Sequence, residues 1–156
     1  MRVPLTLVFV REGRRILLGM KKRGFGVGRW NGFGGKLVGG ESIIEGAKRE
    51  LYEESGLRAL TLTKRGLLSF SWQGKESVLD VSVFEVDAWE GDLCEGEEMR
   101  PKWFLLDEIP FASMWSDDIY WFPYLLKRIP FVGTFLFDHE DKVLQYSVTA
   151  QKKEQK

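Results

Sequence analysis

The pattern of apolar and polar positions along the chain predicts three β-hairpins and one further strand. The candidate strands are rich in β-branched and apolar residues, and short polar turns separate them. In the first strand Leu5, Leu7 and Phe9 share one face, and Thr6 lies on the other. The predicted hairpins are Val3–Val10 with Ile16–Met20, Thr61–Ser71 with Ser77–Val86, and Phe131–Asp138 with Val143–Val148, and the further strand is Met99–Leu106.

Helical spacing and capping residues predict two helices between these strands. The first runs from about Ser42 to Ser55, because Ser42 and Glu45 have the form of a capping box and Gly56 suits a left-handed C-terminal cap. Its packing strip is Ile44, Ala47 and Leu51. The second helix is expected to be capped by Ser116 and to pack through Trp121, Phe122 and Leu125.

Glu50, Glu53 and Glu54 share the other face of the first predicted helix. Like charges at neighbouring helical positions repel by about a few tenths of a kcal/mol per pair, so a helix that keeps them usually has compensation. Magnesium, which prefers oxygen ligands, is one candidate. A solvated face balanced by Lys48 and Arg49 is the other, and the helix alone leaves both open.

The segment from Gly24 to Gly35 is predicted to be a loop, because it holds six glycines among twelve residues. Such loops often approach phosphates closely, but many only turn the chain. The segment is not a Walker loop, since Trp30 stands where that motif needs glycine, and it is not a dinucleotide-binding turn.

Composition and charge exclude several classes of function. With 156 residues and 44% hydrophobic content, the chain fits one globular domain. Lysine plus arginine equals aspartate plus glutamate at 23 each, so there is no basic field of the kind that holds nucleic-acid polymers. No apolar run approaches the roughly 20 residues that a membrane span requires.

The scarcity of histidine and cysteine narrows the chemistry further. His139 is the only histidine and lies in a predicted turn, which argues against a Ser-His-Asp triad or a multi-histidine zinc site. Cys94 is the only cysteine, so no disulfide can form within the chain. The N-terminus lacks the pattern of a signal peptide, and we expect a reducing, intracellular compartment.

The spacing of the acidic helix and the glycine before it resembles the nudix box. Gly35 is followed after five residues by Glu41 and, after seven more, by Arg49-Glu-Leu-Tyr-Glu-Glu-Ser-Gly-Leu57, which fills every defining position. Four further segments look like the subfamily of eukaryotic MutT homologues that hydrolyse oxidised purine nucleoside triphosphates, and the resemblance runs from Leu5 to about Tyr146. These segments are Met20–Gly26, Arg29–Lys36, Glu98–Pro101 and Met114–Asp118.

The resemblance implies an α+β nudix fold, with a mixed β-sheet sandwiched between α-helices. It also implies magnesium-dependent hydrolysis of oxidised purine nucleoside triphosphates, such as 8-oxo-dGTP and 2-hydroxy-dATP, to the monophosphate and pyrophosphate. This activity sanitises the nucleotide pool. The expected partner is therefore a small-molecule nucleotide, not a nucleic-acid polymer or a membrane.

The same resemblance assigns the metal and catalytic residues. The backbone carbonyl of Gly34 and the side chains of Glu50, Glu53, Glu54 and Glu98 are the expected magnesium ligands, with Glu97 as the fallback for Glu98. One of these glutamates is the general base, and the sequence does not distinguish among them. Arg49 is expected to orient the carboxylates through charge-assisted hydrogen bonds.

The expected substrate site is an aromatic pocket with polar groups that read the purine. Asp117 and Asp118 are adjacent, so one of them can retain a proton and the pair can offer one donor and one acceptor. Trp72, Leu79 and Ser116 depart from the residues of the subfamily, which has proline in place of Ser116. The expected contacts are Thr6, Lys21, Asn31, Phe33, Gly34, Gly35, Lys36, Phe70, Trp72, Leu79, Trp115, Ser116, Asp117 and Asp118.

Two alternative functions remain open at the level of sequence. One keeps the nudix chemistry and changes the substrate to another nucleoside diphosphate derivative. The other is a nucleotide-binding module without turnover. For organisation, we expect a single domain over residues 1–150, a polar, disordered tail over residues 151–156, a monomer, and a cytoplasmic location with the nucleus or mitochondria as further compartments.

Overall fold

The computed structural model describes residues 1–151, and the expected tail beyond Gln151 lies outside the described residues. A mixed sheet forms the centre of the structure, with strands in the order β10-β9-β5-β6-β1-β2-β3 and β8 paired with β2. The main strands are β1 (Arg2–Glu12), β2 (Arg15–Lys21), β5 (Thr63–Trp72), β6 (Val78–Val86), β8 (Met99–Leu105), β9 (Phe131–Phe137) and β10 (Val143–Ala150). The predicted mixed sheet is confirmed.

The three predicted hairpins are present as β1–β2, β5–β6 and β9–β10, all antiparallel. Two parallel pairs, β1 with β6 and β5 with β9, join the hairpins into one sheet. Short strands add β3 (Trp30–Asn31) to β2, and pair β4 (Arg58–Ala59) with β7 (Trp89–Glu90). The parallel pairs are long-range contacts that no local sequence pattern predicts.

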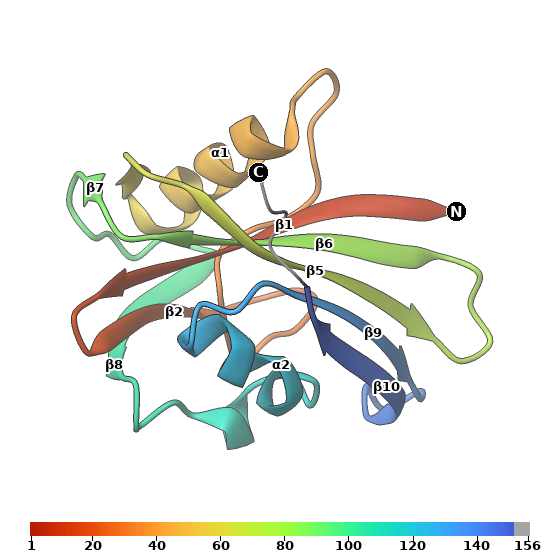
Figure 1. The fold of residues 1–156 in the computed structure, drawn as a ribbon. Coiled ribbons are helices and arrows are strands. Elements are labelled where there is room, and N and C mark those ends of the chain that lie inside the picture. Colours follow the sequence, from red (N-terminus) through yellow and green to blue (C-terminus); the bar gives the residue numbers. More distant parts are fainter. Residues whose placement is uncertain (152–156) are drawn as a thin grey trace, which may run out of the picture.

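Helices α1 (Ile43–Ser55) and α2 (Asp118–Leu126) lie on opposite sides of the sheet (Figure 1). Ala47 and Leu51 of α1 pack with Val8 and Val10 of β1, while Leu7 and Phe9 pack on the side of α2. The alternation predicted for β1 is therefore confirmed, since its two faces belong to two separate cores. A short 3-10 helix, η1 (Phe111–Ser113), precedes α2.

The capping predicted for α1 is confirmed in detail. Ser42 Oγ accepts a hydrogen bond from Glu45 N at 3.1 Å, Glu45 Oε1 accepts one from Ser42 N at 3.1 Å, and Gly56 is left-handed with φ of 83°. The predicted packing strip is wrong at one position, because Ile44 is 51% exposed. The buried residues of α1 are Gly46, Ala47, Leu51 and Ser55, so the sheet does not cover the first turn.

Strands β1 and β2 pair only near their turn, over Val10–Glu12 and Arg15–Leu17, and then diverge. The chain after β3 fills the gap, because Phe33 and Lys36 form isolated bridges with Val8 and Leu5 of β1. Three backbone hydrogen bonds hold this segment on β1: Thr6 N to Gly35 O at 3.0 Å, Val8 N to Phe33 O at 2.6 Å and Phe33 N to Val8 O at 2.9 Å. The sheet is therefore split beside β1, which is where the site described next is found.

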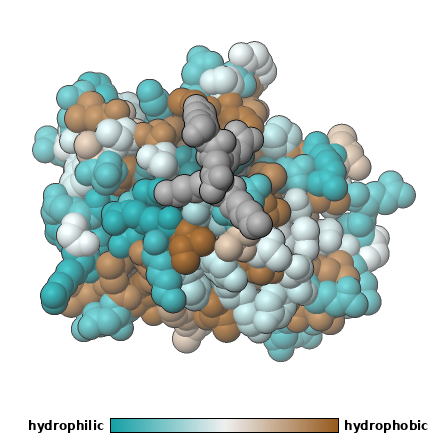
Figure 2. Space-filling model, viewed as in Figure 1, coloured by the Kyte–Doolittle hydropathy of each residue, from teal (hydrophilic) through white to brown (hydrophobic). Residues whose placement is uncertain are grey.

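The visible face of the molecule has apolar and polar residues interspersed over the strands and helices (Figure 2). No helix among residues 1–151 is both long enough and apolar enough to span a membrane.

Candidate active site

A pocket of about 390 Å³ opens at the split in the sheet and reaches from the side of α2 to that of α1. Trp115, Asp117 and Asp118 line it at the start of α2, and Glu54 of α1 lines it at the opposite end. Aromatic and aliphatic side chains from β1, β5 and β6 form a further part of the wall. They include Leu5, Leu7, Phe70, Trp72, Leu79 and Val81.

Two buried polar atoms in the pocket wall have no hydrogen-bond partner among the described residues. Thr6 Oγ1 and Asp118 Oδ2 belong to side chains that are 2% exposed, and both residues line the pocket. An unpaired buried polar group costs about 1–3 kcal/mol, so native proteins rarely keep two in one cavity without a use. These atoms are candidate hydrogen-bonding groups for a ligand.

Burial sets the protonation states of the aspartate pair. The pKa of Asp118 is held well above its ordinary value by burial, by the charge of Asp117 and by the hydrogen bond between them. The pKa of Asp117 is raised less, because burial is opposed by a hydrogen bond of 2.7 Å from Trp121 Nε1 to Asp117 Oδ2. Burial therefore raises the pKa of both carboxyls, and Asp118 holds its proton more firmly than Asp117.

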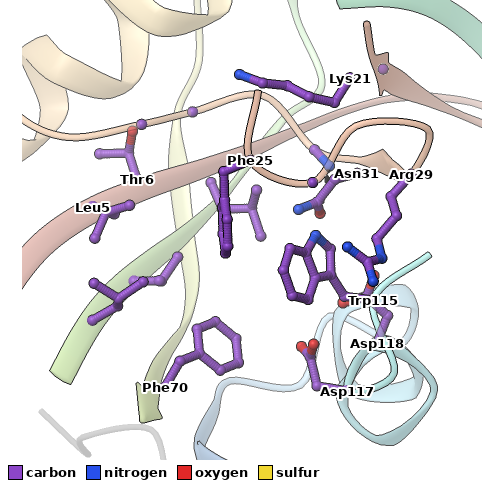
Figure 3. A pocket seen from close by; sticks show the side chains of 18 of the residues that line it. Leu5, Thr6, Lys21, Phe25, Arg29, Asn31, Phe70, Trp115, Asp117 and Asp118 are labelled. Atoms are coloured by element: carbon purple, nitrogen blue, oxygen red, sulfur yellow. Dashed lines mark hydrogen bonds between the residues drawn. The ribbon is translucent and has the colours of Figure 1, made fainter. Parts of the chain in front are cut away.

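Asn31 and Lys21 reach the pocket from the neighbouring strands (Figure 3). Asn31 Oδ1 accepts a hydrogen bond from Gly32 N at 2.8 Å, which leaves the amide NH2 as the group offered to a ligand. Lys21 Nζ lies 3.6 Å from Glu98 Oε2, and its charge acts on Glu54. Lys36 is exposed at the rim of the same pocket.

Gly34 and Gly35 bring the loop backbone against the glutamates of α1. Gly34 N donates to Glu54 Oε1 at 2.8 Å. A Cβ at Gly34 would overlap the carbonyl oxygen of Thr6, and one at Gly35 would stand 3.1 Å from the carboxylate of Glu50. Glycine is therefore required at position 34, and it lets the loop touch both β1 and the acidic helix.

Arg49 binds three carboxylates on the acidic side of α1. Its guanidinium donates to Glu41 Oε2 at 2.7 Å, to Glu50 Oε1 at 2.7 Å and to Glu53 Oε2 at 3.1 Å. The hydrogen bonds to Glu41 and Glu50 raise the pKa of Arg49 above its ordinary value. The guanidinium thus balances three carboxylates that would otherwise repel one another.

Glu54 lies outside this network. Burial raises the pKa of Glu54 to about 8, against the lowering effect of the Gly34 hydrogen bond, and the charge of Glu50 adds to the increase. A carboxylate that is buried with so little compensating charge is a natural neighbour for a cation.

The predicted ligand set is not gathered into one cluster. Within residues 1–151, no group of three or more His, Cys, Asp or Glu side chains is arranged to hold a metal ion. Glu50 and Glu53 are turned toward Arg49, while Glu98 accepts a hydrogen bond from Arg23 Nε at 2.8 Å. The pKa of Glu98 is lowered by that bond and by the nearby charge of Lys21.

Two predicted substrate contacts lie outside the pocket wall. The Phe33 side chain is fully buried in the core beneath α1, so only its backbone serves the loop. Ser116 does not cap α2, whose N-cap Asp117 makes no side-chain capping bond; the Ser116 hydroxyl donates to the carbonyl oxygen of Asp141 at 2.9 Å. The other predicted substrate contacts, from Thr6 to Asp118, all line the pocket.

Phe25 and Arg29 are pocket residues that the sequence analysis missed. The Phe25 ring is 69% exposed and lies 5.1 Å from Trp115 between ring centroids, while the Arg29 guanidinium lies 4.2 Å over the indole of Trp115 (Figure 3). Glycines with positive φ flank Phe25 at positions 24 and 26. An exposed aromatic residue between two glycines was the available signal.

The chain is similar to several known proteins. Residues 1–125 match the NUDIX domain family. The oxidized purine nucleoside triphosphate hydrolase of Mus musculus is 57% identical over 143 residues, and that of Danio rerio is 51% identical over 144 residues; each alignment covers 92% of both chains. The crystal structure of a MutT protein from Bacillus halodurans superposes with a TM-score of 0.84 at 28% identity, covering 94% of this chain and 97% of that one.

Proposed function

The chain belongs to the Nudix hydrolase family, and we propose that it hydrolyses oxidised purine nucleoside triphosphates to the monophosphate and pyrophosphate. The observation that carries the proposal is the pair of unpartnered polar atoms in an aromatic pocket, Thr6 Oγ1 and Asp118 Oδ2. A purine presents donors and acceptors on its edge and an aromatic face, which such a pocket complements. The two vertebrate relatives, named as hydrolases of this class, support the same substrate.

In this proposal the base is bound on the α2 side of the split sheet. Trp115 forms an aromatic wall beside the purine, protonated Asp118 donates a hydrogen bond to it, and Asp117 accepts one. Asn31 and Thr6 provide the remaining polar contacts. The triphosphate then extends along Gly34 and Gly35 toward α1, with Lys21 and Lys36 beside it.

The residues at the α1 end fit magnesium, because the donors are carboxylate and backbone oxygens and Glu54 is buried with little compensating charge. Glu50, Glu53, Glu54, Glu98 and the Gly34 carbonyl would hold the ion, after Glu50 and Glu53 turn from Arg49. When bound, magnesium neutralises phosphate charge and lowers the pKa of water.

Glu54 is the proposed general base, because it is the one glutamate of this set that lines the pocket. A water oxygen forms a bond to phosphorus, the bridging P–O bond breaks and pyrophosphate leaves. Glu54 in its ionised form accepts the proton of the attacking water, and its raised pKa of about 8 makes it a stronger base than an ordinary carboxylate. General-base catalysis of this kind contributes about 10²- to 10⁴-fold to a rate.

Pyrophosphate release in the presence of magnesium tests the proposal. We expect the wild type to hydrolyse 8-oxo-dGTP and 2-hydroxy-dATP faster than dGTP or ADP-ribose, and Glu54→Gln to lose at least about 100-fold in kcat. Glu12→Gln, a matched change at an exposed residue of the β1–β2 hairpin, should keep full activity. Preference for ADP-ribose would instead favour another nudix substrate, and nucleotide binding without pyrophosphate release would favour a binding module.

Magnesium binding can be measured apart from turnover. Titration calorimetry with magnesium chloride alone should give heat of binding for the wild type and little for Glu54→Gln. The proposal also includes a monomer, checked by light scattering after size-exclusion chromatography. It places the enzyme in the cytoplasm, with the nucleus and mitochondria as further compartments where DNA precursors are used.

A further inference from the structure

The turn between β9 and β10 is bonded to both tryptophan walls of the pocket. Trp72 Nε1 donates to Asp141 Oδ1 at 2.8 Å, and Ser116 Oγ donates to Asp141 O at 2.9 Å. Because Ser116 directly follows Trp115, one residue outside the pocket wall is bonded both to Trp72 and to the segment that carries Trp115. Trp72 and Ser116 are also positions where the sequence departs from its subfamily.

Trp72 is fixed from two directions. Its indole stacks on Phe137, its register partner in the β5–β9 pair, with ring centroids 5.0 Å apart and planes at 27°. The bond to Asp141 sets the rotation of the ring within this stack. It also occupies the indole N–H, so Trp72 presents hydrocarbon rather than a donor to the pocket.

Trp115 is supported from its outer side. The Arg29 guanidinium covers one face of the indole, and Phe25 lies toward the other (Figure 3). Arg29 Nη2 is 3.9 Å from Asp141 Oδ2, a separation too long for a hydrogen bond but short enough for charge attraction across a partly exposed site. The Asp141 carboxylate therefore acts on both walls at once.

The turn holds Asp141 in place without using its side chain. Asp138 Oδ1 accepts hydrogen bonds from Glu140 N at 2.8 Å and from Lys142 N at 3.0 Å, and Asp138 N donates to Lys142 O at 2.9 Å. Asp141 is left-handed with φ of 62°, a conformation that Asp, Asn and Gly adopt more readily than other residues. Glycine or asparagine at position 141 should therefore leave the turn intact.

We propose that Asp141 is a positioning residue for the base pocket, which sets the spacing and orientation of Trp72 and Trp115. The inference rests on the proposed function, because it takes the pocket between these walls as the site of the purine. Asp141 is not among the residues that line the pocket, so it should touch neither the base nor the phosphates. Its effect should appear in affinity for the base and leave the phosphate side unchanged.

Four variants test the proposal: Asp141→Gly, Asp141→Asn, Trp72→Phe and the matched control Glu140→Gly, which changes an exposed residue of the same turn. Asp141→Gly should raise KM for 8-oxo-dGTP about tenfold, which is the lower end of the effect expected when a hydrogen bond to a charged acceptor is lost. Its kcat should change less than about twofold. Asp141→Asn keeps an acceptor for Trp72 and should restore most of the affinity. Glu140→Gly should match the wild type.

Further measurements separate positioning from general loosening of the fold. Asp141→Gly should weaken inhibition by a purine nucleoside monophosphate while leaving inhibition by pyrophosphate unchanged, because only the monophosphate contacts the walls. The NMR resonance of the Trp72 indole N–H can be assigned because it is missing from the spectrum of Trp72→Phe. This resonance should move upfield in Asp141→Gly and stay in place in Asp141→Asn. The loss of binding free energy in the double variant Asp141→Gly/Trp72→Phe should be smaller than the sum of the losses in the two single variants.

Equal KM values in Asp141→Gly and the wild type, or equal weakening of monophosphate and pyrophosphate, would overturn the positioning role. The proposed function fails separately, if the wild type releases no pyrophosphate from any purine triphosphate. In that case calorimetry with the purine monophosphate still tests the positioning role. Asp141→Gly must bind the monophosphate about tenfold more weakly than the wild type. A smaller difference, or no binding of the monophosphate to either protein, would overturn the positioning role.

Discussion

Replacing Asp118 with asparagine is expected to change how stability depends on pH. Asp118 is 2% exposed, and burial first and then the charge of Asp117 hold its pKa well above the ordinary value. In the unfolded chain the same carboxyl has a pKa of about 3.9. The folded state therefore binds one more proton than the unfolded state at every pH between the two values.

The sign follows from this difference in bound protons. A group with a raised folded pKa contributes stability that is fully present below its unfolded pKa and is lost as pH rises toward its folded pKa. Across this window the wild type loses about 1.4 kcal/mol of unfolding free energy per pH unit from Asp118. Asp118→Asn lacks this loss. The unfolding free energy of Asp118→Asn minus that of the wild type should therefore increase by about 1.4 kcal/mol for each unit that the pH rises.

Urea unfolding followed by circular dichroism, repeated at several pH values from 5 to 7, measures the slope directly. Glu54 and Asp117 also have raised pKa values, but both are present in both proteins, so the difference reports the carboxyl that the Asp118→Asn substitution removes from the aspartate pair. Asp138→Asn is a suitable control, because the pKa of Asp138 is lowered by backbone hydrogen bonds and the group is already ionised over this range. If the unfolding free energies of Asp118→Asn and the wild type changed in parallel with pH, Asp118 would be ionised in the folded protein. The assignment of Asp118 as the donor and Asp117 as the acceptor would then be wrong.

Three further substitutions address the loop, the acidic network and the packing of α1. Gly34→Ala places a methyl group on the carbonyl oxygen of Thr6, so the loop must leave β1. We expect kcat/KM to fall at least about 100-fold and the melting temperature to drop. Gly39→Ala is the control and should be neutral, because a Cβ at Gly39 meets nothing within 4 Å. Arg49→Lys cannot reproduce the two hydrogen bonds that the guanidinium donates to Glu41. We expect the free energy of unfolding in urea to fall by about 1–2 kcal/mol and kcat to decrease. Unchanged stability would mean that these hydrogen bonds are dispensable. Ile44→Lys should change the free energy of unfolding by less than about 0.5 kcal/mol, because the Ile44 side chain is exposed. Leu51→Ala should lower the free energy of unfolding by about 2–5 kcal/mol, because Leu51 is buried. Similar losses in both variants would show that Ile44 is buried.

Local signals in the sequence predicted the elements that depend on local geometry. The ends of α1 follow from Ser42, Glu45 and Gly56, whose capping interactions involve only neighbouring residues. Ile44 was misplaced because helical spacing shows which positions share a face, whereas burial depends on how far the sheet extends beneath the helix. Ser116 was misplaced because its partner, Asp141, lies 25 positions away and no local pattern marks it.

The candidate site was predicted largely through the resemblance to a family. Thr6, Asn31, Trp115 and the aspartate pair line the pocket, yet alternation and capping alone gave each of them an ordinary structural role. The carboxylates of α1 were identified correctly as one face, but their partners were not foreseen. Arg49 holds Glu50 and Glu53 while Glu54 turns into the pocket, a division that depends on the position of Gly34 in three dimensions.

The divergence of β1 from β2 has a consequence for engineering the protein. Because the pocket passes through the opening between these strands, its two ends belong to different helices, α1 and α2, and to different cores of the molecule. Under the proposed function, substitutions on the α2 side should vary which base is accepted without moving the carboxylates on the α1 side. A variant library limited to the α2 side should therefore vary base selectivity, and one limited to α1 should vary catalytic rate.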